Sequence, residues 1–224
     1  MATSKNLEPA TQQVDLCRRL REEIILGRLP HGRRITEKYL ADHMRVKRGP
    51  ARESLLILEG QGLIRKVPSL GYFVESHSAE EIRDVYDLRL ALETMAVRRA
   101  ALQAAREDLV RFELIGEEER AAMSRGDKDA RVRCDLDFHQ TIVNASGSRV
   151  LVRAYASVAR PIYGSADLSA EKTARVVAQH AAIGKAIRAR DPDRAVALLR
   201  RHITEHNQAD ACARTGARKS RGGL

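Results

Sequence analysis

The sequence predicts a mainly α-helical protein with two domains: a small helix-turn-helix unit that ends in a β-hairpin, and a larger antiparallel helical bundle. Three observations support this fold class. Apolar residues recur at helical spacing along most of the chain. Ala, Leu, Arg and Glu, which favour helix, dominate the composition. The strand candidates are confined to residues 63–67 and 72–75.

The first domain is expected over residues 10–76, after a disordered segment at 1–9. A helix over 10–27 is indicated by a stripe that includes Leu16, Leu20 and Ile24. Thr36 is a plausible N-cap for a helix over 36–44, and a further helix follows over 47–61. With the hairpin that follows, these helices predict a winged helix-turn-helix.

The second domain is expected over residues 77–213. It begins with a capping box, Ser78 with Glu81, and then continues as an antiparallel bundle of about six helices. We expect these helices over 78–104, 106–125, 127–146, 148–164, 171–190 and 192–213. Gly116 is a weak point within the second of them, and residues 214–224 are expected to form a basic, disordered tail.

Positive charge is concentrated in the helix-turn-helix. Residues 33–52 hold seven Lys or Arg and two Asp or Glu, which gives this segment a formal charge of +5, whereas residues 77–213 carry +1. A basic helix-turn-helix is typical of a domain that binds the phosphates of duplex DNA. Arg48 and Arg52 lie one helical turn apart and are expected to project outward. The alternative is a solvated basic face without a partner.

Cysteine usage and hydropathy favour a cytoplasmic protein without a membrane partner. The three cysteines are an odd number without the close spacing of a metal site, which fits a reducing compartment. No apolar run approaches the roughly 20 residues needed to span a bilayer, and the N-terminus lacks the apolar core of a signal peptide.

Four residues of the second domain form a candidate metal site. Asp135 and His139 lie four residues apart on one helix face, while His180 and His202 lie on or beside the apolar faces of two other expected helices. In a bundle such faces converge, and one carboxylate with three imidazoles suits a divalent transition ion, with Zn²⁺ favoured and Ni²⁺ or Mn²⁺ as alternatives. Each histidine could equally be an ordinary core residue, and His206 competes with His202 as a ligand.

Arg89 interrupts an inward-facing apolar stripe, and a buried guanidinium requires an anionic partner. That partner is either Glu93, one helical turn away, or a bound anion.

The motifs Val46-Lys-Arg-Gly-Pro-Ala-Arg-Glu-Ser-Leu55 and Gly71-Tyr-Phe-Val74 resemble the winged-helix domain of GntR-type bacterial regulators. The resemblance covers residues 12–75. It implies that Lys38, Arg48 and Arg52 contact DNA and that Gly71 lets the wing approach the minor groove. Lys47 stands where the family has a small hydroxyl residue, and a lysine can also bind phosphate.

Residues 78–210, with Asp135-Leu-Asp-Phe-His139, His180 and His202, are similar to the all-helical C-terminal (FCD) domain of the FadR-like branch, and six helices are similar to the VanR-type subgroup. This resemblance implies that the four residues bind a metal and that Arg89 holds the carboxylate of an effector. It also implies a homodimeric regulator, most often a repressor, that binds a near-palindromic operator and is released by a small carboxylate.

Two other functions fit parts of the sequence. A metal-dependent enzyme acting on a small organic acid would use the same Asp/His₃ set, but the sequence lacks a general base in a recognisable motif. An architectural nucleic-acid-binding protein would fit the basic domain, but the nearly neutral second domain argues against it.

Overall fold

The computed structural model describes the backbone of residues 9–158 and 170–219, and the side chains of residues 13–158 and 171–205. Two compact units make up the chain, Met1–His77 and Ser78–Leu224. The described residues form nine helices and three short strands, so the prediction of a mainly α-helical protein is confirmed. Apart from Pro9, the segment expected to be disordered at 1–9 lies outside the described residues, as does the end of the helix expected over 148–164.

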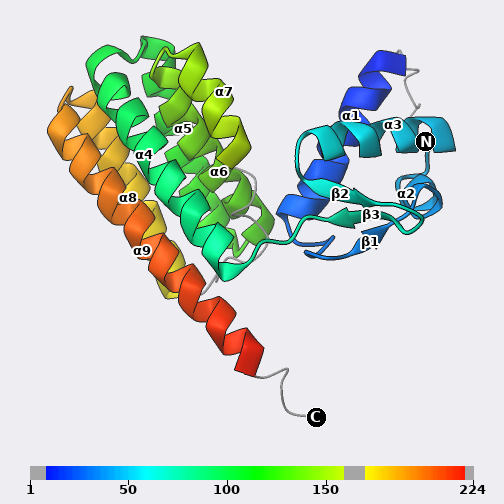
Figure 1. Ribbon diagram of the computed structural model, residues 1–224. Helices are drawn as coiled ribbons and strands as arrows, with labels where there is room; N and C mark the ends of the chain where they lie inside the picture. The colour runs from blue at the N-terminus through cyan, green and yellow to red at the C-terminus, as the bar shows by residue number, and fades with distance from the viewer. Residues whose placement is uncertain (1–8, 159–169, 220–224) are drawn as a thin grey trace. The chain divides into compact units, whose positions relative to one another are not determined.

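The first unit is a winged helix-turn-helix (Figure 1). It contains α1 (Pro9–Ile25), β1 (Arg34–Ile35), α2 (Glu37–Met44), α3 (Arg48–Gly60), β2 (Ile64–Val67) and β3 (Gly71–Val74). The strands are antiparallel in the order β1-β3-β2. Strand β1 is absent from the sequence-based expectation because two residues show no periodicity of their own. The strand exists because Arg34 and Ile35 pair with Phe73 and Tyr72.

Local signals set the geometry of the helix-turn-helix. The hydroxyl of Thr36 accepts a hydrogen bond from the backbone N–H of Tyr39 at 3.0 Å and caps α2, as predicted. Arg45 has a φ of 55° and ends α2 in the left-handed conformation, which turns the chain toward α3. Leu40 of α2 and Leu55 of α3 are fully buried, so apolar packing fixes the two helices against each other.

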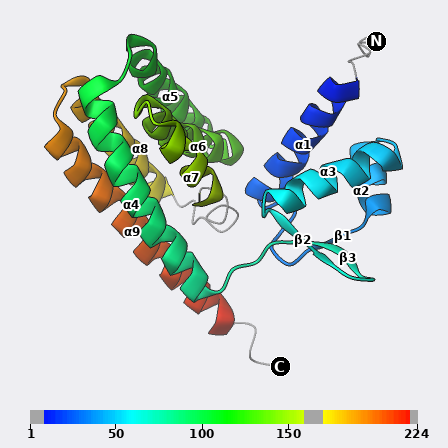
Figure 2. The same ribbon diagram turned by 45° about the horizontal axis from the view of Figure 1, so that its top comes forward.

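The second unit is a bundle of six described helices (Figures 1 and 2). They are α4 (Ala79–Gln103), α5 (Arg106–Arg125), α6 (Lys128–Ala145), α7 (Arg149–Val158), α8 (Ala170–Arg188) and α9 (Pro192–Lys219). Ser78 and Glu81 form the predicted capping box at the start of α4. Gly116 does not interrupt α5.

One expectation for the C-terminus was wrong. Helix α9 continues to Lys219, so the segment expected to be disordered from residue 214 is helical in its first part. The physical reason is composition, because Ala, Arg and Lys in this segment favour helix. The single Gly216 costs only about 1 kcal/mol relative to alanine.

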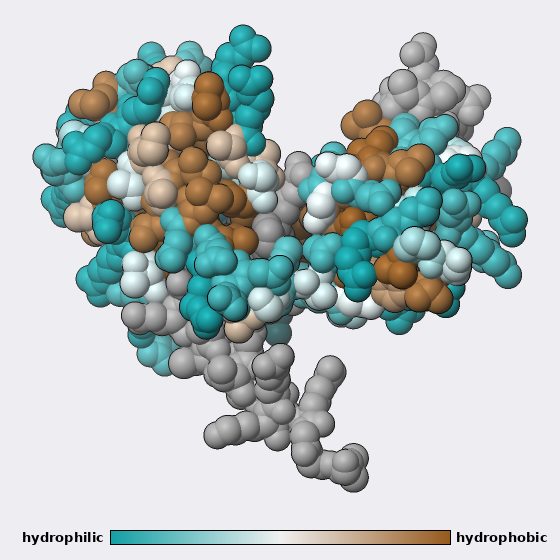
Figure 3. Space-filling model, in the orientation of Figure 1, coloured by the Kyte–Doolittle hydropathy of each residue, from teal (hydrophilic) through white to brown (hydrophobic). Residues whose placement is uncertain are grey.

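Helix α4 packs against α6, α7, α8 and α9 and runs beside α9 along an outer side of the bundle. The core around it is aliphatic, with Ile142, Ile183 and Leu199 completely buried. One side of α4 is nevertheless apolar and exposed: Leu88, Met95 and Leu102 are each at least half exposed and lie seven residues apart. Apolar side chains also gather on the face of the bundle seen in Figure 3.

None of the helices in the described part of the chain combines the length and the apolar character required to cross a membrane.

Candidate metal centre and candidate DNA-binding surface

The basic residues predicted to contact DNA are all exposed on the helix-turn-helix. Lys38 lies on α2, Lys47 immediately precedes α3, and Arg48 is the first residue of α3. Arg52, one turn further along α3, is 69% exposed and lies 3.9 Å from Glu37 in a loose ion pair. The start of α3 therefore presents cations to solvent, as a recognition helix must before it enters a major groove.

The wing contributes two further cations that the sequence analysis did not identify. Arg65 and Lys66 of β2 are exposed, and each lies against an aromatic ring of β3: Arg65 over Phe73 and Lys66 over Tyr72. The signal was present in the sequence, because these two polar residues lie between Ile64 and Val67 in a short strand.

The backbone conformation at position 71 favours glycine. Its φ is +101°, and a Cβ at this position would lie 3.4 Å from the carbonyl oxygen of Ile35. The tip of the wing is held by Arg34, whose Nε donates a hydrogen bond to the carbonyl oxygen of Leu70 at 2.6 Å. Gly71 thus allows β3 to pair closely with β1 at the base of this tip.

The four predicted metal ligands come together in the bundle. Asp135 and His139 lie on α6, His180 lies on α8 and His202 lies on α9. One ligand atom from each residue lies within 4.8 Å of the others. The three histidines are 0–2% exposed, whereas the side chain of Asp135 is 20% exposed, so the cluster is accessible to solvent beside the aspartate.

Each imidazole is oriented by an acceptor at its Nδ1 atom. His139 Nδ1 lies 2.6 Å from Glu93 Oε2, and His180 Nδ1 lies 2.9 Å from Glu119 Oε1. His202 Nδ1 lies 2.9 Å from Gln179 Oε1. Because carboxylate and amide oxygens accept hydrogen bonds, this arrangement assigns the ring proton of each neutral histidine to Nδ1.

The Nε2 atoms of the three histidines consequently face one another with their lone pairs. His139 Nε2 and His180 Nε2 lie 3.1 Å and 3.3 Å from His202 Nε2. Asp135 Oδ1 lies 3.6 Å from His180 Nε2 and adds negative charge to the same space. Lone pairs at these distances repel unless a cation lies among them, so the donor set fits a divalent transition metal.

The carboxyl groups around the centre are strongly affected by burial. Desolvation raises the pKa of Glu93, and the opposing effect of the Arg89 cation is smaller. Desolvation likewise raises the pKa of Asp135, against the effects of His180 and Arg89. A cation among these groups would favour their ionised forms.

Arg89 lies beside the centre, completely enclosed by the bundle. It is 2% exposed, and its Nε donates to Glu93 Oε1 at 2.5 Å. Glu93, one helical turn away, is therefore an anionic partner of Arg89, as one of the two expected alternatives. Glu93 also accepts from His139, so a continuous chain of contacts runs from Arg89 through Glu93 to a metal-ligand candidate.

Glu119 and Gln179 were missed as partners of the histidines. Glu119 could have been found, because it follows Phe112 and Ile115 on the buried face of α5, where a carboxylate needs a partner. Gln179 gave no such signal, since a glutamine beside a histidine is common on any helix. The side chain of His206, the competing ligand, lies outside the described side chains.

Comparisons with known proteins agree with this architecture. Residues 12–74 match the gntR family of bacterial regulatory proteins, and residues 84–205 match the FCD domain. The chain belongs to the gntR family and carries an FCD domain, which makes it a DNA-binding transcription regulator.

Two relatives and one solved structure illustrate the similarity. The transcriptional regulator YdhC of Bacillus subtilis is 30% identical over 64% of this chain and 65% of that protein. The transcriptional repressor RspR of Escherichia coli is 27% identical over 90% of this chain and 89% of that protein. The structure of E. coli McbR/YncC has a TM-score of 0.81 at 19% identity, covering 91% of this chain and 98% of that chain, and so shares the fold.

Family membership also decides between the functions that the sequence analysis considered. The family and the relatives are transcription regulators, so the interpretation as a metal-dependent enzyme is not supported.

Proposed function

We propose that this protein is a metal-containing repressor that binds a near-palindromic operator as a homodimer in the cytoplasm and leaves it when a small carboxylate binds. The observation that carries the proposal is the meeting of three imidazole Nε2 atoms and one aspartate inside the bundle. An ordinary core would not bring three lone pairs together in a buried space. The repressor role is supported by the similarity to RspR.

The proposed metal ligands are Asp135, His139, His180 and His202. Three nitrogens and one carboxylate oxygen suit Zn²⁺ best, with Ni²⁺ and Mn²⁺ as alternatives. When bound, such an ion supplies a Lewis-acidic position for an anionic ligand. Glu93, Glu119 and Gln179 would orient the imidazoles by accepting their Nδ1 protons.

The proposed effector is a small carboxylate, which would be held between the metal and Arg89. Arginine suits this role because its guanidinium matches a carboxylate in geometry and charge. Arg89 would also act through Glu93, because any movement of its guanidinium is transmitted to His139. Effector binding and operator binding must then change each other's affinity by the same factor.

The proposed operator contacts are Lys38, Lys47, Arg48 and Arg52, with the wing positioned by Gly71. Their exposure supports this role, and arginine can bind guanine through two hydrogen bonds. The apolar stripe of Leu88, Met95 and Leu102 on α4 supports a homodimer, because a large exposed apolar surface is typical of a protein–protein contact. A two-fold protein reads a two-fold site.

Metal content tests the ligand set. Purified wild-type protein should hold about one equivalent of transition metal by elemental analysis, and His202→Ala should lose most of it, because one of the three imidazole ligands is then missing. His206→Ala is the matched control and should keep its metal. If His202→Ala retains the metal while His206→Ala loses it, His206 is the ligand and the proposed set is wrong.

Operator binding tests the DNA-binding surface. Arg52→Ala should weaken binding to the DNA upstream of its own gene by about 10–100-fold in a gel shift, because a two-bonded arginine–guanine contact contributes about 1–3 kcal/mol. Arg18→Ala, which removes an exposed arginine from α1, should bind normally. Unchanged binding by Arg52→Ala, with its metal content intact, would refute the assigned surface.

A further inference from the structure

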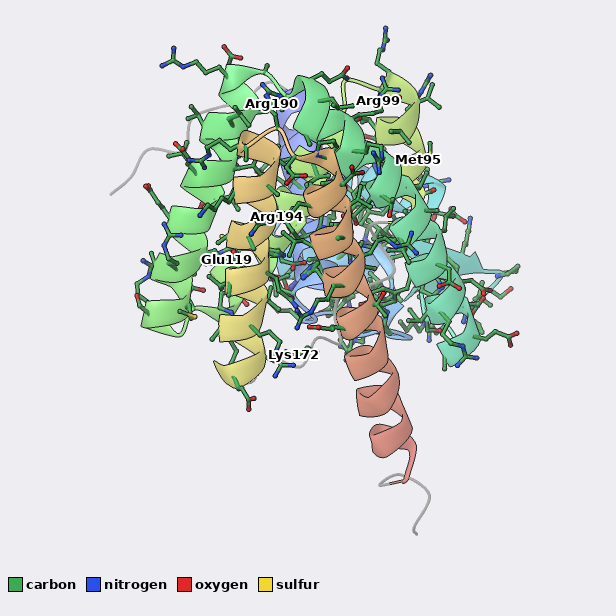
Figure 4. The ribbon with its side chains drawn as sticks, turned by 90° about the vertical axis from the view of Figure 1, so that its left-hand side faces the viewer. Met95, Arg99, Glu119, Lys172, Arg190 and Arg194 are labelled. Atoms are coloured by element: carbon green, nitrogen blue, oxygen red, sulfur yellow. The ribbon has the colours of Figure 1, made fainter. Side chains whose placement is uncertain are left out.

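A hollow of about 500 Å³ lies between α5 and α8, and Arg89 does not line it. Helices α5 and α8 pack against each other, and Figure 4 views the bundle from the side on which they lie next to one another. Phe138 of α6 and His180 of α8 are among the residues that line the hollow. Its volume is within the range of about 300–1,000 Å³ that is usual for small-molecule sites.

Two glycines in the middle of helices keep this hollow open. Gly116 of α5 and Gly184 of α8 both line it. Neither has a positive φ. A Cβ at Gly184 would meet the Cβ of Phe112 at 3.9 Å, an ordinary contact. Alanine would therefore fit there, and it would favour the helix by about 1 kcal/mol. Close backbone packing therefore does not require a glycine at this position, and the lack of a larger side chain leaves the space beside it open.

The floor of the hollow is aromatic. Phe112 and Phe138 meet edge to face, with ring centroids 5.7 Å apart. Phe138 and His180 stack, with ring centroids 4.0 Å apart. Phe112 and Phe138 are 6% and 2% exposed, so only small parts of their rings reach the hollow. Those parts form an apolar contact surface for another ring.

The rim of the hollow favours an anion over a cation. It carries Arg120, Lys185 and Arg188 against Glu113 and Glu117, so its formal charge is +1. Arg188 is paired with Glu113. Among the described residues, Arg120 and Lys185 show no ion pair, and Arg120 Nη1 lies directly over Gly116, 3.4 Å from where a Cβ would be. The unpaired positive charge thus lies beside the space that the glycines leave.

We propose that the hollow between α5 and α8 binds a small aromatic carboxylate. The ring lies in the space beside the two glycines, in contact with the exposed parts of Phe112 and Phe138, and the carboxylate accepts hydrogen bonds from Arg120 and Lys185. This site goes beyond the proposed function, which placed the effector at the metal and Arg89. The two sites share His180, whose ring belongs to the floor of the hollow and whose Nε2 belongs to the metal cluster.

Benzoate is a suitable probe because it combines one ring with one carboxylate, and acetate is the control that lacks the ring. In isothermal titration with the full chain, benzoate should show a saturable binding step that acetate lacks. Gly184→Leu fills the hollow and should abolish this benzoate-specific step, whereas Gly184→Ala adds only a methyl group and should retain it. Lys185→Ala should weaken binding by about tenfold, as expected for a charge-assisted hydrogen bond. Lys128→Ala, which removes an exposed lysine outside the hollow, should not.

The proposal is overturned if the wild type shows no saturable benzoate binding, or if folded Gly184→Leu binds benzoate as well as Gly184→Ala does. If Gly184→Leu does not fold, the comparison of Lys185→Ala with Lys128→Ala decides, and equal affinities would reject the site. Metal content and operator binding are measured on the same preparations. If the hollow does not bind benzoate, metal content and operator binding should still be as proposed. If the proposed function is wrong, these two measurements should show it independently of benzoate.

Discussion

Replacing Glu119 with alanine should weaken metal binding without touching a proposed ligand. Glu119 lies on α5, and both of its carboxylate oxygens lie within hydrogen-bonding distance of His180 Nδ1, at 2.9 Å and 3.2 Å. Its only proposed role is to hold the imidazole with Nε2 toward the centre. Without this acceptor, His180 can change its tautomer or rotate, and its lone pair no longer points at the metal.

The magnitude follows from burial. Loss of an outer-shell partner typically lowers metal affinity about 10–100-fold, which corresponds to about 1.4–2.7 kcal/mol. The side chains of His180 and Glu119 are 2% and 3% exposed, so bulk water has little access to replace the lost acceptor. We therefore expect a loss near the upper end of this range. The metal-free protein should also lose about 1–3 kcal/mol of unfolding free energy, because the Nδ1–H donor stays buried without a partner.

The assay is competition for Zn²⁺ against a chromophoric chelator, with Glu118→Ala as the matched control. Glu118 is the adjacent carboxylate on the same helix and is exposed, so both variants change the net charge equally. Thermal unfolding in the presence of chelator reports the folding cost separately. Equal Zn²⁺ affinities for the two variants would refute the role of Glu119 and, with it, the assignment of the His180 proton to Nδ1.

Three other predictions concern stability. Arg89→Met should lower the unfolding free energy by about 3–5 kcal/mol, because it leaves the Glu93 carboxylate buried without its cation; in denaturant titrations Arg83→Met, at an exposed position of α4, should cost far less. Gly71→Ala should lower the unfolding free energy by about 1–2 kcal/mol, because its φ of +101° disfavours a side chain, and it should weaken operator binding. The control Gly60→Ala, with no atom within 4 Å of its Cβ, should be neutral or stabilising. Equal thermal midpoints for the two variants would contradict this reasoning. Burial raises the pKa of Tyr72. The unfolded chain therefore releases this proton at a lower pH than the folded chain, and the unfolding free energy should fall as the pH rises through about 10. If a Tyr72→Phe variant loses the same stability over this pH range, Tyr72 is not the source of the loss.

Much of the fold can be predicted from short-range features of the sequence. The capping box of Ser78 and Glu81 and the N-cap at Thr36 start helices within one residue of the expected positions, because capping depends on residues three apart. Strand β1 and the last turns of α9 were not predicted from the sequence, for opposite reasons. Strand β1 exists only through its pairing with β3, whereas α9 continues because helix propensity outweighs one glycine.

The candidate metal site likewise contains residues that the sequence could predict and residues that only helix packing brings together. Helical spacing could place Asp135 and His139 on one face and His180 and His202 on or beside the apolar faces of two other helices, and the family resemblance supported the same set. No local pattern could predict that Glu119 would hold His180, since 61 residues separate them and only the packing of α5 against α8 brings them together.

The sequence by itself determined the helices, the basic recognition surface and the residue types available to bind a metal, because these depend on neighbours within one or two turns. The tertiary structure alone decided which lone pairs meet, which carboxylates orient them and where two helical glycines leave a hollow. Those relations depend on helix packing, in which side chains distant in the sequence must fit the same small volume.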